Sequence, residues 1–143
     1  MKNIAVFASG SGSNAENIIN HFSKSDKARV KLVLSENPDA YVLERAKRLK
    51  VPTHIFSMND LSKLGKGSVL DLLKLKKIDF IALAGFLKLM PTAIVDEFSK
   101  RIVNIHPALL PKYGGKGMYG AHVHKAVIDA KESKSGITIH LVN

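Results

Sequence analysis

The stretch Asn3-Ile4-Ala5-Val6-Phe7-Ala8-Ser9-Gly10-Ser11-Gly12-Ser13-Asn14 decides the fold class, because an apolar run changes there directly into a glycine loop. Residues 3–8 are almost continuously apolar, which is typical of a strand buried on both faces of a sheet. Residues 15–22 then carry apolar side chains at helical spacing. A strand, a glycine loop and a helix in this order direct free backbone N–H groups toward an anion.

The glycine loop favours a single phosphate over a dinucleotide. Gly10 and Gly12 allow a close approach to the backbone, and we expect Ser13 or Asn14 to cap the helix. No Gly-Lys-Ser/Thr follows, so the loop is not a P-loop, and the third glycine of the dinucleotide pattern is absent. The alternative is a tight turn with a helix cap. We predict phosphate binding at Gly12, Ser13 and Asn14.

A second informative stretch is Asn104-Ile105-His106-Pro107-Ala108-Leu109-Leu110-Pro111. Residues two apart in a strand point the same way, so Asn104 and His106 are expected to project together. Pro107 disfavours helix for the residue before it and ends the strand there. Open α/β sheets bind ligands at such carboxyl ends. An amide can donate to a developing oxyanion, and an imidazole can move protons near neutral pH. The alternative is a core asparagine and a helix-capping histidine.

The remainder of the chain alternates apolar runs with helical patterns. Further strands are predicted at residues 30–34, 54–56, 80–84, 102–105 and 137–142, and helices at 41–49, 69–75, 94–98 and 123–130, with a surface loop at 62–68. Repeated strand–helix units imply a parallel sheet with helices on both faces. The predicted fold is therefore α/β, with a Rossmann-like, doubly wound and mostly parallel sheet in one domain over residues 1–143.

Composition agrees with an ordinary globular domain. The 143 residues are 45% hydrophobic and 24% charged, and no apolar run is long enough to cross a bilayer. The first residues predict a strand rather than a cleavable signal. Cysteine is absent, so neither disulfides nor thiolate metal sites are expected, and no His/Asp/Glu spacing suggests a metal. We expect a cytoplasmic protein with no membrane partner.

The formal net charge of +10 raises the alternative of a nucleic-acid-binding module. The basic residues, however, fall into separate groups that we assign to helix ends and helix-to-strand connections, where cations favour the helix C-terminus. These groups are Lys24, Lys27, Arg29, Lys31, Arg45, Lys47, Arg48, Lys50, Lys74, Lys76 and Lys77. Aromatic residues do not interleave with them, so a platform for stacking bases is missing. We therefore expect no nucleic-acid partner.

Taken together, the motifs resemble those of the phosphoribosylglycinamide formyltransferase family. The matching segments are GSGSN at 10–14, LAGF at 83–86, NIHPALLPKY at 104–113, AHVH at 121–124 and GITIHLV at 136–142. The resemblance implies transfer of a formyl group from 10-formyltetrahydrofolate to glycinamide ribonucleotide in purine biosynthesis, with no metal. It makes Asn104 and His106 the catalytic pair. Two departures are Ala108, where many members have serine, and a longer glycine-rich loop at 114–120.

The resemblance also implies where the folate binds. Residues 85–91 are unusually apolar for a loop, and packing onto the next helix is the alternative explanation. In the family reading, Leu87, Lys88, Leu89 and Met90, together with Asn104, offer a pteridine both hydrogen bonds and apolar walls, a mixture that suits a flat ligand. Secondary candidates for the site are His122, which could equally cap a helix, and the alternating pair Thr138 and His140. His21 and His54 are expected to be ordinary surface or partly buried residues.

The family pattern continues beyond residues 136–142 into an acidic loop with a catalytic aspartate, whereas this sequence ends at Asn143. We therefore expect a formyltransferase domain truncated at its C-terminus, with an exposed edge at the last strand and impaired catalysis. Two other functions stay open. One is the related formyltetrahydrofolate hydrolase, although the GSGSN loop suits a ribose phosphate. The other is a non-catalytic nucleotide-binding module, which would leave the Asn-x-His pair unexplained. The oligomeric state cannot be predicted from these residues.

Overall fold

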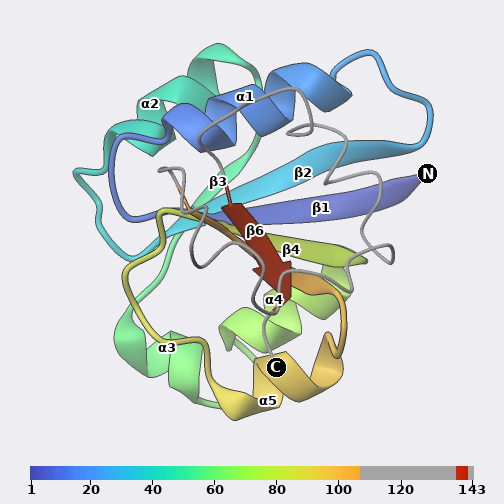
Figure 1. Cartoon of the computed structure of the whole chain (residues 1–143). Coiled ribbons are helices and arrows are strands. Elements are labelled where there is room, and N and C mark those ends of the chain that lie inside the picture. The colour runs from blue at the N-terminus through green and yellow to red at the C-terminus, as the bar shows by residue number, and fades with distance from the viewer. Residues whose placement is uncertain (107–137, 142–143) are drawn as a thin grey trace.

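The computed structural model describes residues 1–106 and 138–141 (Figure 1). The strands are β1 (Lys2–Phe7), β2 (Ala28–Ser35), β3 (Thr53–Ile55), β4 (Phe80–Ala84), β5 (Ile102–His106) and β6 (Thr138–Leu141). The helices are α1 (Ser13–Phe22), α2 (Tyr41–Arg48), α3 (Met58–Ser62), α4 (Val69–Leu75) and α5 (Thr92–Glu97). The helix predicted at 123–130 lies outside the described residues.

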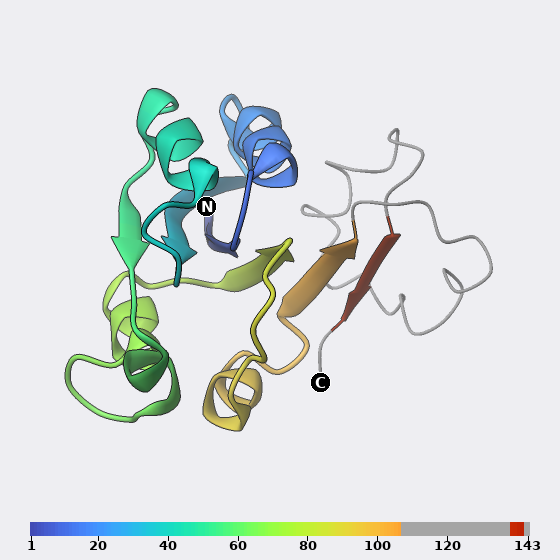
Figure 2. The same ribbon diagram turned by 90° about the vertical axis from the view of Figure 1, so that its left-hand side faces the viewer.

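In the described part of the chain, one six-stranded sheet has the order β3-β2-β1-β4-β5-β6. Neighbours from β3 to β5 pair in parallel, and β6 pairs antiparallel with β5 (Figure 2). The chain moves outward from β1 in one direction, then crosses back to β4 and continues in the other. This confirms the predicted Rossmann-like, doubly wound and mostly parallel sheet.

Helices cover both faces of the sheet. Figure 1 shows α1 and α2 on one side and α3, α4 and α5 on the other. Successive side chains of β1 point to opposite faces of the sheet and so join two separate core clusters. Ile4 and Val6 pack in the cluster with α1 and α2, whereas Ala5 and Phe7 pack in the opposite cluster. All four side chains are fully buried. The apolar run of β1 therefore faces protein on both sides, as predicted.

Three local details differ from the sequence predictions. Helix α3 was not predicted, because its five residues are too few to show a helical period. Its start is capped by Ser57, whose hydroxyl accepts the Asp60 N–H at 3.0 Å. The placement of Arg29 and Lys31 at a helix end or connection was wrong, since both lie within β2. Ser68, at the end of the predicted surface loop, is buried and caps α4.

Candidate functional site

The candidate site lies where the sheet order reverses, at the carboxyl ends of β1 and β4. The loop after β1 and the end of β4 line an open cavity of about 140 Å³. Its lining residues are Gly10, Ser11, Gly12, Ser13, Asn14, Ala84 and Gly85. In doubly wound sheets, this reversal point is where ligands bind. The predicted phosphate residues therefore line a cavity at the expected position.

The start of α1 differs from the sequence prediction. Neither Ser13 nor Asn14 caps the helix, and the N-cap is Gly12, with a left-handed φ of 79° and no side-chain cap hydrogen bond. A Cβ on Gly12 would lie 2.4 Å from Val42 Cγ2 and 2.7 Å from Val42 Cα. The glycine is therefore required by its close contact with α2. Since the first N–H groups of a helix have no acceptor within it, the side chains and amides of Ser13 and Asn14 stay available to an anion.

A buried hydroxyl connects the two loops of the site. Ser9 Oγ donates to Glu36 Oε1 at 2.9 Å and accepts the Leu87 N–H at 2.9 Å. Ser9 lies in the loop after β1, Glu36 follows β2, and Leu87 lies in the loop after β4. This contact could not be predicted from the sequence, because its partners are far apart in the chain and a serine within a glycine-serine loop has no local signature.

We predict that Ser9→Ala lowers the free energy of unfolding by about 1–2 kcal/mol, since it leaves the Leu87 N–H without its acceptor in a partly buried place. Urea unfolding of the variant and the parent measures the difference. Ser11→Ala, at an exposed position of the same loop, is the control and should change stability by less than about 0.5 kcal/mol. Equal stability of the Ser9 variant and the parent would contradict a stabilising role for this contact.

The loop after β4 presents apolar side chains in two different ways. Leu87 and Leu89 are 82% and 90% exposed, whereas Met90 is buried in the core. Phe86 anchors the loop, with its ring centroid 5.4 Å from that of Phe7. Lys88 is exposed. Of the residues predicted to hold folate, the two leucines thus offer free apolar surface, and Met90 has only its backbone to offer.

The predicted catalytic pair lies on β5, beside β4. Asn104 is half-buried, and His106 is the last residue of the strand, as the following proline predicted. In the antiparallel pairing, Asn104 stands opposite His140 and His106 opposite Thr138. The register of β5 and β6 therefore brings four of the predicted site residues to neighbouring positions, namely Asn104, His106, Thr138 and His140. His122 lies outside the described residues.

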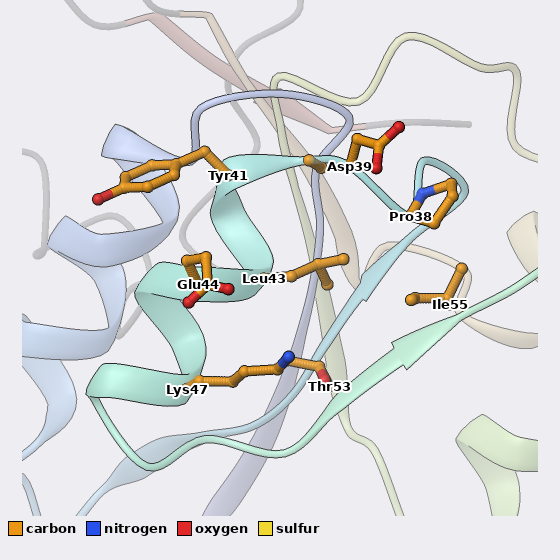
Figure 3. A pocket seen from close by; sticks show the side chains of 9 residues that line it. Pro38, Asp39, Tyr41, Leu43, Glu44, Lys47, Thr53 and Ile55 are labelled. Carbon is orange, nitrogen blue, oxygen red and sulfur yellow. The ribbon is translucent and has the colours of Figure 1, made fainter.

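A second hollow, of about 310 Å³, lies between α2 and β3 (Figure 3). Leu43 and Ile55 contribute apolar walls, and Glu44 and Lys47 contribute opposite charges. It contains none of the residues predicted for the site and lies toward the outer edge of the sheet, where β3 is the last strand. The reversal point therefore remains the candidate site.

Within residues 1–106 and 138–141, no group of three or more His, Cys, Asp or Glu residues could hold a metal ion. In the same ranges, no helix combines the length and apolar character needed to cross a membrane. His21 is exposed and His54 half-buried, as predicted.

The sequence is similar to known proteins over nearly its whole length. A model of the family described as "Formyl transferase" matches residues 2–143. A chloroplastic phosphoribosylglycinamide formyltransferase of Arabidopsis thaliana is 43% identical over 148 residues, which cover 99% of this chain and 50% of the relative. The Haemophilus influenzae phosphoribosylglycinamide formyltransferase is 36% identical, over 100% of this chain and 66% of its own length. The chain thus spans from about half to two thirds of the length of these curated relatives.

Solved structures agree with these relatives. Glycinamide ribonucleotide transformylase 1 from Geobacillus kaustophilus is 38% identical, with a TM-score of 0.72 over 100% of this chain and 75% of the other. Phosphoribosylglycinamide formyltransferase from Streptococcus pneumoniae is also 38% identical, with a TM-score of 0.68 over 100% of this chain and 74% of the other. These matches confirm the resemblance inferred from the sequence motifs. The chain belongs to the formyl transferase family.

Proposed function

We propose that this protein transfers a formyl group from 10-formyltetrahydrofolate to the amine of glycinamide ribonucleotide, a step of purine biosynthesis. The observation that carries the proposal is that two motifs lie near the carboxyl ends of parallel strands in the same part of the sheet. The glycine loop follows β1 and Asn104 lies on β5, and β4 alone separates these two strands. A phosphate-binding loop near an amide and an imidazole is what a phosphorylated amine acceptor requires.

The chemistry assigns a separate task to each residue of the pair. The substrate amine attacks the formyl carbon, and a tetrahedral oxyanion forms. Asn104 would donate a hydrogen bond to that oxyanion, and protonated His106 would add its charge. The intermediate then collapses by breaking the bond between the formyl carbon and the folate nitrogen. One proton passes from the amine to the departing folate nitrogen, and His106 helps to move it. No covalent enzyme intermediate is needed.

The loop after β4 supports a folate site in this proposal. Leu87 and Leu89 are almost fully exposed, although leucine gains free energy when its surface leaves water. A flat heterocycle lying against them would cover that surface. Lys88, between the two leucines, is exposed and carries a positive charge that suits an anionic folate.

The test is a formyl-transfer assay with the purified protein and 10-formyltetrahydrofolate, with and without glycinamide ribonucleotide. We expect formylated glycinamide ribonucleotide and tetrahydrofolate in equal amounts, and no turnover without the acceptor. Release of formate in the absence of the acceptor would instead identify a hydrolase. Binding of glycinamide ribonucleotide with no transfer and no hydrolysis would indicate a non-catalytic nucleotide-binding module.

We predict that Asn14→Ala and Ser13→Ala each weaken the binding of glycinamide ribonucleotide by about tenfold or more, because one side-chain hydrogen bond to a charged phosphate is lost. Calorimetric titration of both variants and the parent measures the change. Asn17→Ala, one turn further along α1 and exposed, is the matched control and should bind like the parent. Unchanged affinity in both test variants would remove their side chains from the phosphate site.

A further inference from the structure

We propose that Arg45 is a positioning residue that sets the glycine loop in its anion-binding conformation. This inference rests on the proposed function, since the anion considered is the phosphate of glycinamide ribonucleotide. Arg45 lies on α2 and is not a lining residue of the cavity at the reversal point. It would therefore act through the loop backbone and not through contact with the ligand.

Three contacts hold the Arg45 side chain in place. Its Nε donates to the Ser11 carbonyl oxygen at 2.6 Å, and its Nη1 lies 2.7 Å from Glu16 Oε1 on α1. Its guanidinium carbon lies 5.0 Å from the centroid of the Tyr41 ring. In Figure 3 the Tyr41 ring points away from Leu43 and Ile55. The Arg45 side chain is 25% exposed. A planar guanidinium held by three partners is a rigid donor to the loop.

The hydrogen bond from Arg45 to the Ser11 carbonyl also fixes the direction of the next N–H group in the loop. In a planar trans peptide, the C=O and the following N–H point in opposite directions. Since Arg45 holds the Ser11 carbonyl toward α2, the Gly12 N–H must point away from α2. The Val42 N–H holds the Gly10 carbonyl in the same way at 3.0 Å, so the Ser11 N–H is also directed away from α2.

We infer from the lining of the cavity that these amides are directed toward it. Its lining includes residues 10–14 and the end of β4, with no residue from α2. Two successive N–H groups directed to one side form the kind of concavity that binds anions. Helix α2, through Arg45 and the Val42 backbone, therefore organises a site that it does not itself line.

The charge of Arg45 is a weaker explanation than its geometry. The ion pair with Glu16 offsets the guanidinium charge close to the loop. Arg48 separates the two explanations, because it carries the same charge on the same helix and lies over the same Tyr41 ring, at 5.2 Å. Its side chain also donates to the Tyr41 hydroxyl. The hydrogen bonds described for Arg48 do not include one to the glycine loop.

The experiment compares Arg45→Met, Arg45→Lys and Arg48→Met in the formyl-transfer assay. For Arg45→Met we expect the KM for glycinamide ribonucleotide to rise about tenfold, the loss expected from a charge-assisted hydrogen bond, with kcat and the KM for folate within about twofold. Arg45→Lys keeps the charge but not the fixed planar donor, and should show most of the same defect. Arg48→Met should match the parent in all three constants.

Several outcomes overturn the inference. An unchanged KM in a folded Arg45→Met variant would do so, as would an equal rise in Arg48→Met, which would indicate a charge effect. A parallel loss of kcat and of the affinity for both substrates would indicate that the Arg45 contacts only stabilise the fold. Calorimetric binding of ribose 5-phosphate keeps the test separate from the proposed function. If the parent transfers no formyl group, weaker ribose 5-phosphate binding in Arg45→Met alone still supports the inference, and no binding by the parent rejects it.

Discussion

Replacing His106 with alanine is expected to slow formyl transfer by about a hundredfold or more, since a positioned acid–base group contributes at least that factor. Replacing Asn104 with alanine should have a similar effect, because one lost donor to a developing oxyanion costs about a hundred- to a thousandfold in kcat. Single-turnover rates at saturating substrates measure both. The double variant should lose less than the product of the two factors, since both groups act on one transition state.

The control for this prediction is His54→Ala. His54 is half-buried on β3, which is separated from β5 by three strands. Its replacement therefore shows the effect of removing a histidine that lies away from the candidate site. It should transfer formyl groups at the parental rate. A His106→Ala variant that folds normally and keeps near-normal turnover would show that this histidine has a structural role. Thermal unfolding of each variant separates loss of structure from loss of chemistry.

Gly12→Ala should lower the free energy of unfolding by about 2–4 kcal/mol, the sum of left-handed strain and overpacking. The φ of Gly12 is 79°, and an added Cβ would lie 2.4 Å from Val42 Cγ2 and 2.7 Å from Val42 Cα. The second contact is with backbone, so a change of side-chain rotamer cannot relieve it. Urea unfolding monitored by circular dichroism measures the loss.

Gly10→Ala is the matched control, because a Cβ at this position meets nothing within 4 Å. Its stability should stay within about 0.5 kcal/mol of the parent. In the Gly12→Ala background, Val42→Ala should recover only part of the loss, since it removes Cγ2 but leaves Cα and Cβ in place. Full recovery, or a Gly10 variant as unstable as the Gly12 variant, would contradict the steric explanation.

Much of the fold could be predicted because its strands are coded locally. Continuous apolar runs mark β1 and β4, which are buried on both faces, and Pro107 marks the end of β5. The start of α1 could not be predicted in the same way. Serine and asparagine are preferred caps, but contact with Val42, far along the chain, requires glycine at the N-cap. A tertiary contact overrode the local preference.

The site was predicted as a set of motifs and not as a set of contacts. The alternation of Thr138 and His140 indicated a strand, but not that it would run antiparallel to β5 with His140 opposite Asn104. Ser9, Glu36 and Arg45 were not predicted as site residues at all. Each acts through a hydrogen bond to a residue distant in sequence, and a single sequence carries no periodic signal for such a bond.

The hydrogen bonds from α2 to the glycine loop have a consequence for the order in which the protein folds during synthesis. The strand and glycine loop that suggest an anion site leave the ribosome early, but their carbonyl groups find partners at Val42 and Arg45 only later. A nascent chain that has not yet exposed α2 carries the complete phosphate motif in a form that lacks these restraints. Under the proposed function, affinity for phosphate is acquired only when α2 docks, so we expect a ribosome-stalled chain that ends before Tyr41 not to bind glycinamide ribonucleotide.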